Sequence, residues 1–181
     1  MSLTTLKGTY AIDPAHSRIG FSARHAMVTK VRGTFNEFEG VANLDGQNPD
    51  ASKVDVTINA DSFDSGNEMR DGHVRTGDFL DTGKFPQITF KTTAVHVTGD
   101  DTFELTGDLT IKETTKPITI PFEFLGSATD PFGNERIGFE GETVINRKDW
   151  GVEWNAPLEA GGVLVSEKVT LDFEVSAIKQ A

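Results

Sequence analysis

An unusual density of acidic and basic side chains lies in one stretch, MRDGHVRTGDFLDTGKFPQITF, which runs from Met69 to Phe90. Such groups can serve as general acids or bases, and they are Arg70, Asp71, His73, Arg75, Asp78 and Asp81. The stretch offers no nucleophile paired with a base and no glycine-rich turn that would form an oxyanion hole. We therefore favour a second interpretation, a short helix that caps an apolar interior, with Met69 and Val74 inward and the charges outward.

The histidines give no metal-binding pattern. The chain has four of them, His16, His25, His73 and His96, and none forms an H-E-x-x-H or H-x-H spacing. There is no cysteine, which excludes disulfides and thiolate sites. We expect no metal and no cofactor. His25 lies on an apolar stripe, so a core histidine is favoured there over a contact to the polar head of a ligand, which is also an option for His73.

The elements that must position these residues are strands. Apolar and polar residues alternate in eight runs, as in half-buried strands, and TYAID is a candidate for a short ninth. The runs are SRIGFSARHAM, VRGTFNEFEGVANLD, KVDVTINADSF, QITFKTTAV, TFELTGDLTIK, PITIPFEFLG, RIGFEGETVIN and VLVSEKVTLDFEV. A bulge is expected at Asn36-Glu37, and one helix near Asn67 to Thr76. These elements predict an all-β fold, an antiparallel eight-stranded barrel with one short helix capping one end.

Phenylalanines dominate the apolar stripes, and glycines such as Gly107 and Gly141 lie on the same stripes, where they leave room. An eight-stranded barrel is either just filled by its side chains or just able to hold one small ligand. The stripes alone favour a filled core.

Two features beyond the stripes are notable. The loop NRKDWGVEWNAPLEAGG (146–162) holds both tryptophans, Trp150 and Trp154, which either cover an entrance or seal the barrel by packing. Arg147 and Asp149 in this loop are candidates for an ion pair. Glu167 falls on the apolar side of its run, so either the strand bulges there or the carboxylate meets Arg or His near a rim.

Bulk properties narrow the function classes. The 181 residues are expected to form one domain, 1–181, and the net charge of −11 argues against a nucleic-acid or anionic-membrane surface. The N-terminus MSLTTLKGTYAID has no apolar signal-peptide core, and no window approaches the length of a membrane span, so a cytoplasmic location is expected. The sequence leaves a homodimer open.

Four motifs carry a resemblance to a known family. In chain order they are YAIDPAHSRIGFSARHAMVTKVRGTFNEFEG, MRDGHVRTGDFLDTGKFPQITF, LTGDLTIKETTKPITIPF and GFEGETVINRKDWG, and the chain resembles the YceI-like family from about Tyr10 to Ile178. The resemblance implies a lipocalin-like barrel that binds polyisoprenoids, such as quinone tails and prenyl pyrophosphates, in an elongated apolar interior. It therefore favours a cavity over a filled core.

We accordingly expect a carrier or storage protein for a long isoprenoid or similar amphiphilic lipid, and no enzyme. Two alternatives remain: a filled barrel that acts as an interaction module, and an enzyme on a lipid-like substrate that uses His25 or His73. The expected ligand-binding residues are Phe21, Ala23, His25, Phe35, Phe90, Phe103, Leu105, Ile120, Phe122, Phe139, Trp150, Trp154 and Phe173.

Overall fold

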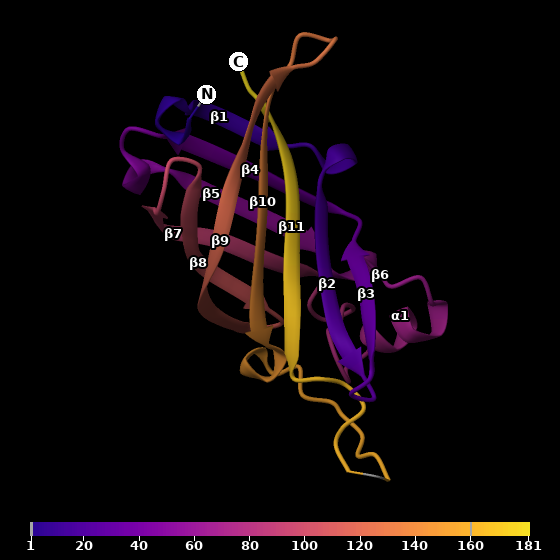
Figure 1. Cartoon of the computed structure of the whole chain (residues 1–181). Helices are drawn as coiled ribbons and strands as arrows, with labels where there is room; N and C mark the ends of the chain where they lie inside the picture. Colours follow the sequence, from indigo (N-terminus) through magenta and orange to yellow (C-terminus); the bar gives the residue numbers. More distant parts are fainter. Residues whose placement is uncertain (1, 160) are drawn as a thin grey trace.

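A computed structural model describes residues 2–159 and 161–181 (Figure 1). Short 3-10 helices accompany the strands at Leu3–Thr5, Pro14–His16, Pro49–Ala51, Ala60–Ser62 and Arg147–Trp150 (η1 to η5), and the α-helix α1 spans Glu68–Val74. The strands are β1 (Lys7–Ile12), β2 (Arg18–His25), β3 (Thr29–Phe35), β4 (Phe38–Asp45), β5 (Lys53–Asn59), β6 (Phe63–Asp64), β7 (Gln87–Val97), β8 (Thr102–Ile111), β9 (Thr114–Thr129), β10 (Glu135–Asn146) and β11 (Lys168–Lys179). No helix of these described residues is long and apolar enough to cross a membrane.

Eight strands form a closed antiparallel barrel in the order β1-β4-β5-β7-β8-β9-β10-β11, because β1 also pairs with β11. Strand β11 is shared between two partners. Its residues 177–179 pair with β1, and its residues 170–174 pair with β2. The β2–β3 hairpin, with the two-residue strand β6, therefore branches from the barrel beside β11 (Figure 1). The predicted fold class is confirmed, and the run TYAID supplies the strand that closes the barrel.

Two details of the strand predictions are wrong. Asn36-Glu37 is not a bulge: the chain leaves the sheet there, since the backbone N–H of Asn36 bonds to Ser62, and β4 pairs with β1 and β5 rather than with β3. A bulge falls instead between Thr92 and Ala94 in β7, which turns Val95 rather than Ala94 toward the interior. Neither change can be read from alternation alone, because both depend on which strand lies alongside.

The two ends of the barrel differ. At one end, called the closed end below, Leu3 and Leu6 of the N-terminal segment pack with Tyr10, Phe124 and Ile137 in a buried cluster. At the other end, called the portal end, lie η5, residues 151–159 and 161–167 of the loop that follows it, and the tip of the β2–β3 hairpin, with α1 beside them (Figure 1).

Helix α1 forms where the sequence predicts it, but it is shorter. Asn67 is its N-cap, and the side-chain oxygen accepts a hydrogen bond from the backbone N–H of Arg70 at 3.0 Å. Val74 lines the barrel interior as expected, whereas Met69 lies at the rim with 88% of its surface exposed. The reason is that Asp71 takes the buried side of the helix, and residues two apart on a helix point in different directions.

Candidate ligand-binding cavity

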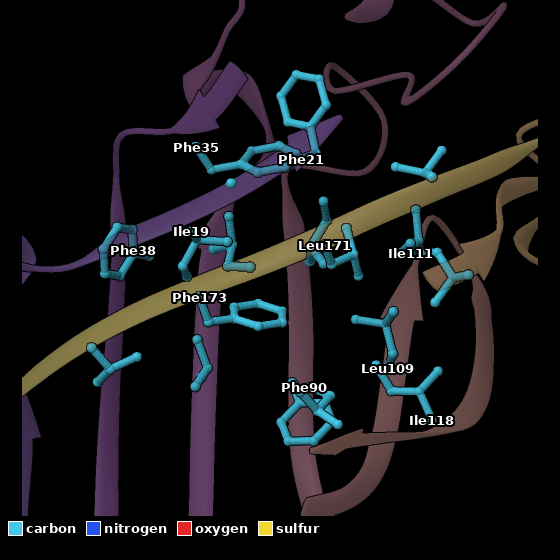
Figure 2. Close-up of a pocket in the computed structure, with 18 of the residues that line it drawn as sticks. Ile19, Phe21, Phe35, Phe38, Phe90, Leu109, Ile111, Ile118, Leu171 and Phe173 are labelled. Carbon is cyan, nitrogen blue, oxygen red and sulfur yellow. The ribbon is translucent and has the colours of Figure 1, made fainter. Parts of the chain in front are cut away.

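A cavity of about 1090 Å³ occupies the barrel interior. Its walls are almost entirely aliphatic and aromatic, and they come from the barrel strands together with β2, β3 and α1 (Figure 2). The cavity reaches the surface at the portal end, where its lining residues Thr29, Lys30, Asn67 and Met69 are exposed. A volume slightly above the usual range of about 300–1,000 Å³ for ligand pockets, with mainly apolar walls, is typical of a site for a large apolar ligand.

Most of the predicted site residues meet at this cavity, although their contact with a ligand stays a prediction. Those that line it are Phe21, Ala23, His25, Phe35, Phe90, Phe103, Leu105, Ile120, Phe122, Phe139, Trp154 and Phe173. They come from seven strands and one loop, and they converge because inward residues of a barrel strand recur with period two. Figure 2 shows Ile19, Phe21 and Phe35 of the branch hairpin beside Leu171 and Phe173 of β11.

The sequence left open whether the tryptophans cover an entrance or seal the barrel by packing, and the two residues differ in this respect. Trp150 is 3% exposed, does not line the cavity, and donates its indole N–H to the carbonyl of Leu109 at 2.9 Å. It is a packing residue, so its inclusion among the site residues is not supported by its position. Trp154 does line the cavity and packs edge-on against His73, with ring centroids 4.7 Å apart.

Sequence reasoning missed lining residues that lie outside the regular stripes. Phe63, in the two-residue strand β6, stacks on Phe21 with centroids 4.5 Å apart. Phe79, in the loop after α1, packs against His73 and Trp154. Neither segment alternates, so only the hydrophobicity of the residues themselves could have marked them as inward.

The stripe glycines do not open space in the way expected, because phenyl rings cover them. A Cβ placed on Gly141 would lie 2.5 Å from the ring of Phe122, its direct cross-strand partner, and a Cβ on Gly107 would lie 2.5 Å from the ring of Phe90. Gly33 and its partner Phe21 repeat the arrangement, again at 2.5 Å. Each missing side chain thus lets a ring lie against the wall of the barrel. The lumen stays open because of where the rings lie, and the glycines themselves do not line it.

The acid-base set around α1 forms structural contacts. The buried carboxylate of Asp71 accepts hydrogen bonds from the backbone N–H and hydroxyl of Ser65. The guanidinium of Arg70 donates to the Ser65 hydroxyl and carbonyl, and that of Arg75 donates to the carbonyls of Asp61 and Phe63. These contacts tie α1 to β6 and the preceding turn, which is what a cap on the barrel requires.

His73 is the one member of the set with a carboxylate partner that suits acid-base chemistry. Its Nε2 lies 2.8 Å from Asp78 Oδ2. Among the described side chains, Asp78 is its only hydrogen-bonding partner, and no hydroxyl nucleophile bonds to its other nitrogen. His25 lines the cavity near its mouth and is exposed, so it is not a core histidine.

Arg147 is a buried cation, and no carboxylate of the described residues pairs with it. Its side chain donates to the carbonyls of Val152, Val165 and Ser166, and it does not pair with Asp149 as the sequence suggested. Burial lowers the pKa of this guanidinium below its usual value. The three bonds hold the long loop of the portal end in place, and the side chain lines the cavity.

Glu167 does not point into the barrel. Strand β11 begins only at Lys168, so the alternation does not reach this residue. Its carboxylate pairs with Lys148 at 3.0 Å, and that contact lowers the pKa of Glu167. The predicted partner, Arg or His, is therefore wrong in identity, although the position near a rim is right.

The strongest charge cluster lies at the closed end, away from the mouth. Arg136 donates to Asp13 at 2.7 Å and to Asp130 at 2.8 Å. These bonds lower the pKa of both carboxyls and raise that of the guanidinium. Among residues 2–159 and 161–181, no group of three or more His, Asp or Glu side chains is arranged to hold a metal ion.

Comparison with known proteins agrees with the fold. The model of the YceI-like domain matches residues 10–177. The protein YceI of Escherichia coli O157:H7 is 42% identical over 173 residues, which cover 94% of this chain and 87% of that one. The UPF0312 protein of Ectopseudomonas mendocina is also 42% identical, with the same coverage.

Solved structures show the same barrel. The YCEI protein of Campylobacter jejuni superposes with a TM-score of 0.74 at 28% identity, covering 87% of this chain and 90% of that one. BcnA of Burkholderia cenocepacia gives 0.80 at 24% identity, covering 91% and 98%. A polyisoprenoid binding domain from Saccharophagus degradans gives 0.69 at 14% identity, covering 94% and 98%. With its four motifs, its closed barrel and its apolar cavity, this chain belongs to the YceI-like family.

Proposed function

We propose that this protein binds one long amphiphilic lipid, an isoprenoid such as a quinone tail or a polyprenol, inside the barrel, and that it acts as a carrier or store. The observation that carries the proposal is the apolar cavity of about 1090 Å³ with its mouth at the portal end. The similarity to a barrel described as a polyisoprenoid binding domain supports the same ligand class.

The energetics favour a long chain. Burying each methylene-sized group gains about 0.8 kcal/mol. Association costs roughly 4–15 kcal/mol in lost translational and rotational freedom. A chain of about twenty carbons gains roughly 16 kcal/mol and exceeds that cost, whereas a short chain does not. The walls therefore select for length, and the few polar groups at the mouth orient the head of the ligand.

The two alternatives fit the structure less well. A filled barrel is inconsistent with a cavity of this size. An enzyme would require a nucleophile or an activated water beside His73 or His25, and the described side chains place no hydroxyl in hydrogen bonding with either imidazole. YceI-like proteins are binding proteins rather than enzymes, and the pairing of His73 with Asp78 fits a role in positioning the loop after α1.

The proposal is tested by identifying what the protein carries. Protein purified without detergent is extracted with organic solvent and analysed by mass spectrometry, and a lipid with a long isoprenoid or alkyl chain is expected in near-stoichiometric amount. The delipidated protein is then titrated with geranylgeraniol while tryptophan emission is recorded, since Trp154 lines the cavity. A parallel incubation checks the recovered ligand for turnover. If no lipid is recovered and no prenol binds, the proposal fails; chemical conversion of the ligand would favour the enzyme.

A further inference from the structure

The tip of the β2–β3 hairpin has a backbone that does not match its sequence. The backbone N–H of Val28 bonds to the carbonyl of His25 at 3.1 Å, and both residues between them have positive φ, Ala26 at 51° and Met27 at 63°. Tight hairpin turns with two positive φ values normally use Asn, Asp or Gly at these positions, because a Cβ is strained there. Strain held by bulkier residues is a signal that those side chains serve another purpose.

The strained turn presents apolar side chains to solvent. Met27 is 64% exposed and Val28 is 73% exposed. Neither lines the cavity, so they are not part of its wall. Met27 contacts Gly162 of the neighbouring loop and the backbone N–H of Ala26 bonds to the carbonyl of Leu164, but most of the surface of Met27 and Val28 stays exposed at the outer end of the hairpin (Figure 1).

The hairpin also carries the opposite charge from the rest of the chain. Residues 14–36 contain no Asp or Glu, although the chain has 28 of them, and they contain Arg18, Arg24, Lys30 and Arg32. Arg18 pairs with Asp172, but within the described residues no carboxylate lies in ion-pair distance of the other three. By contrast, Arg75 and Arg136, which lie outside the hairpin and do not line the cavity, both have carboxylate partners.

The exposed apolar tip and the unpaired cations of the hairpin lie together at the mouth of the cavity. Arg24, Lys30 and Arg32 border the cavity at its mouth and flank the apolar tip. An apolar tip surrounded by unpaired cations is the arrangement that binds the interface of an anionic lipid bilayer, where apolar side chains enter the headgroup layer and cations meet lipid phosphates.

We propose that the turn of residues 26–28 docks the protein on an anionic bilayer and places the cavity mouth against the membrane from which a lipid is taken or to which it is delivered. The transfer role rests on the proposed function, whereas the docking does not. The net charge of −11 opposes binding, but charges farther than about 8 Å from the surface are screened at physiological ionic strength. Glu68, Glu153 and Glu159 on neighbouring segments lower the affinity, so the docking is weak, reversible and salt-sensitive.

The main experiment is flotation with vesicles of equal parts phosphatidylglycerol and phosphatidylcholine, compared with vesicles of phosphatidylcholine alone. The parent protein binds the anionic vesicles and loses binding as salt is raised. The double variant Ala26→Asn/Met27→Gly binds about tenfold less tightly, because it removes the Met27 side chain, one of the two exposed apolar side chains of the tip. It also places in the turn the pair that such turns prefer, so its melting temperature is equal to or above that of the parent. Weakened binding therefore cannot be attributed to misfolding.

A control variant uses an apolar residue at the other end that is more exposed than Met27 or Val28. Phe132, in the β9–β10 hairpin, is 88% exposed, and Phe132→Ser leaves vesicle binding unchanged. Arg32→Gln weakens binding and reduces its dependence on salt. The docking proposal is overturned if the parent binds neither vesicle, if it binds both equally, or if the double variant binds as well as the parent.

Two further measurements distinguish membrane docking from a subunit interface and from failure of the proposed function. If the parent is a dimer in solution and the double variant is a monomer, the tip is a subunit interface and the proposal falls. The double variant, delivered geranylgeraniol from ethanol without vesicles, binds it as the parent does, because residues 26–28 lie outside the lining. Failure of both proteins in that assay would refute the proposed function while leaving the vesicle result intact.

Discussion

The two ends of one barrel are built on opposite rules. At the closed end a cluster of apolar side chains around Phe124 is buried, although Phe132 of the β9–β10 hairpin is exposed, and the arginine at the rim, Arg136, is held between two carboxylates. At the portal end Met27 and Val28 are exposed, Arg24, Lys30 and Arg32 have no carboxylate partner among the described residues, and Ala26 and Met27 adopt left-handed backbone. The same strands run through both ends, so the difference comes from what the connecting segments place on them. Paired and buried side chains at the closed end stabilise the barrel. The exposed apolar and unpaired basic side chains at the portal end are the groups that the two proposals assign to the ligand and to the membrane surface.

The largest change in the free energy of unfolding is expected for a substitution at the closed end. Phe124 is 3% exposed, and Phe124→Ala should lower the free energy of unfolding by about 3–5 kcal/mol, because it removes a ring from a packed cluster. Urea unfolding measures the change. Phe132→Ala, at an exposed ring of the adjoining hairpin, should stay within about 0.5 kcal/mol of the parent. Equal effects of the two substitutions would mean that the closed end is not the packed one.

A substitution in the barrel wall between the two ends is expected to lower stability less, and to weaken prenol binding strongly. Gly141→Ala pushes the Phe122 ring off the wall and into the lumen, so prenol binding should fall, at a cost of about 1–3 kcal/mol in stability from overpacking. Gly138→Ala on the same strand is the control, because its new Cβ meets only ordinary contacts at 3.8 Å or more. If both variants bind geranylgeraniol like the parent, the rings do not set the width of the site.

The ion cluster of Arg136, Asp13 and Asp130 at the closed end predicts a contribution to stability that depends on pH. The pKa values of Asp13 and Asp130 are lowered in the folded protein, so their contribution to stability is present above the ordinary carboxyl pKa of about 3.9 and is lost as the pH falls through the lowered values. Arg136→Gln removes the cause of most of the lowering. Its melting temperature should lie below that of the parent at neutral pH, and the difference should shrink progressively as the pH falls below that ordinary pKa toward the lowered values of the two carboxyls. A difference independent of pH would show that Arg136 acts through packing alone.

The smallest effect on stability is expected at the mouth. Trp154 packs on His73 and Phe79 without a buried hydrogen bond, so Trp154→Phe should change the free energy of unfolding by under about 1 kcal/mol. It should nevertheless abolish most of the ligand-induced change in tryptophan emission, because Trp150 does not line the cavity. A full emission change in the variant would place the reporting tryptophan, and with it the ligand, nearer to Trp150.

Much of the site could be predicted because it lies on strands. Phe21, Phe90 and Phe173 sit on period-two stripes, and a strand turns alternate residues to one side whatever its neighbours are. Phe63 and Phe79 were missed because they lie in segments with no period. The bulge in β7 was missed as well, since it exists only relative to the strand beside it.

The sequence by itself determined most of the strands, the position of the helix, and the inward residues of the regularly alternating strands, because these follow from alternation, turn residues and capping over short distances. Only the tertiary structure decided that the barrel is hollow, that Trp150 packs while Trp154 faces the cavity, and that phenyl rings lie over Gly107 and Gly141. The physical reason is that each of these depends on a partner far away in the chain: the strand pairing sets the width of the barrel, and a cross-strand neighbour decides whether a ring fills the lumen or lies along its wall.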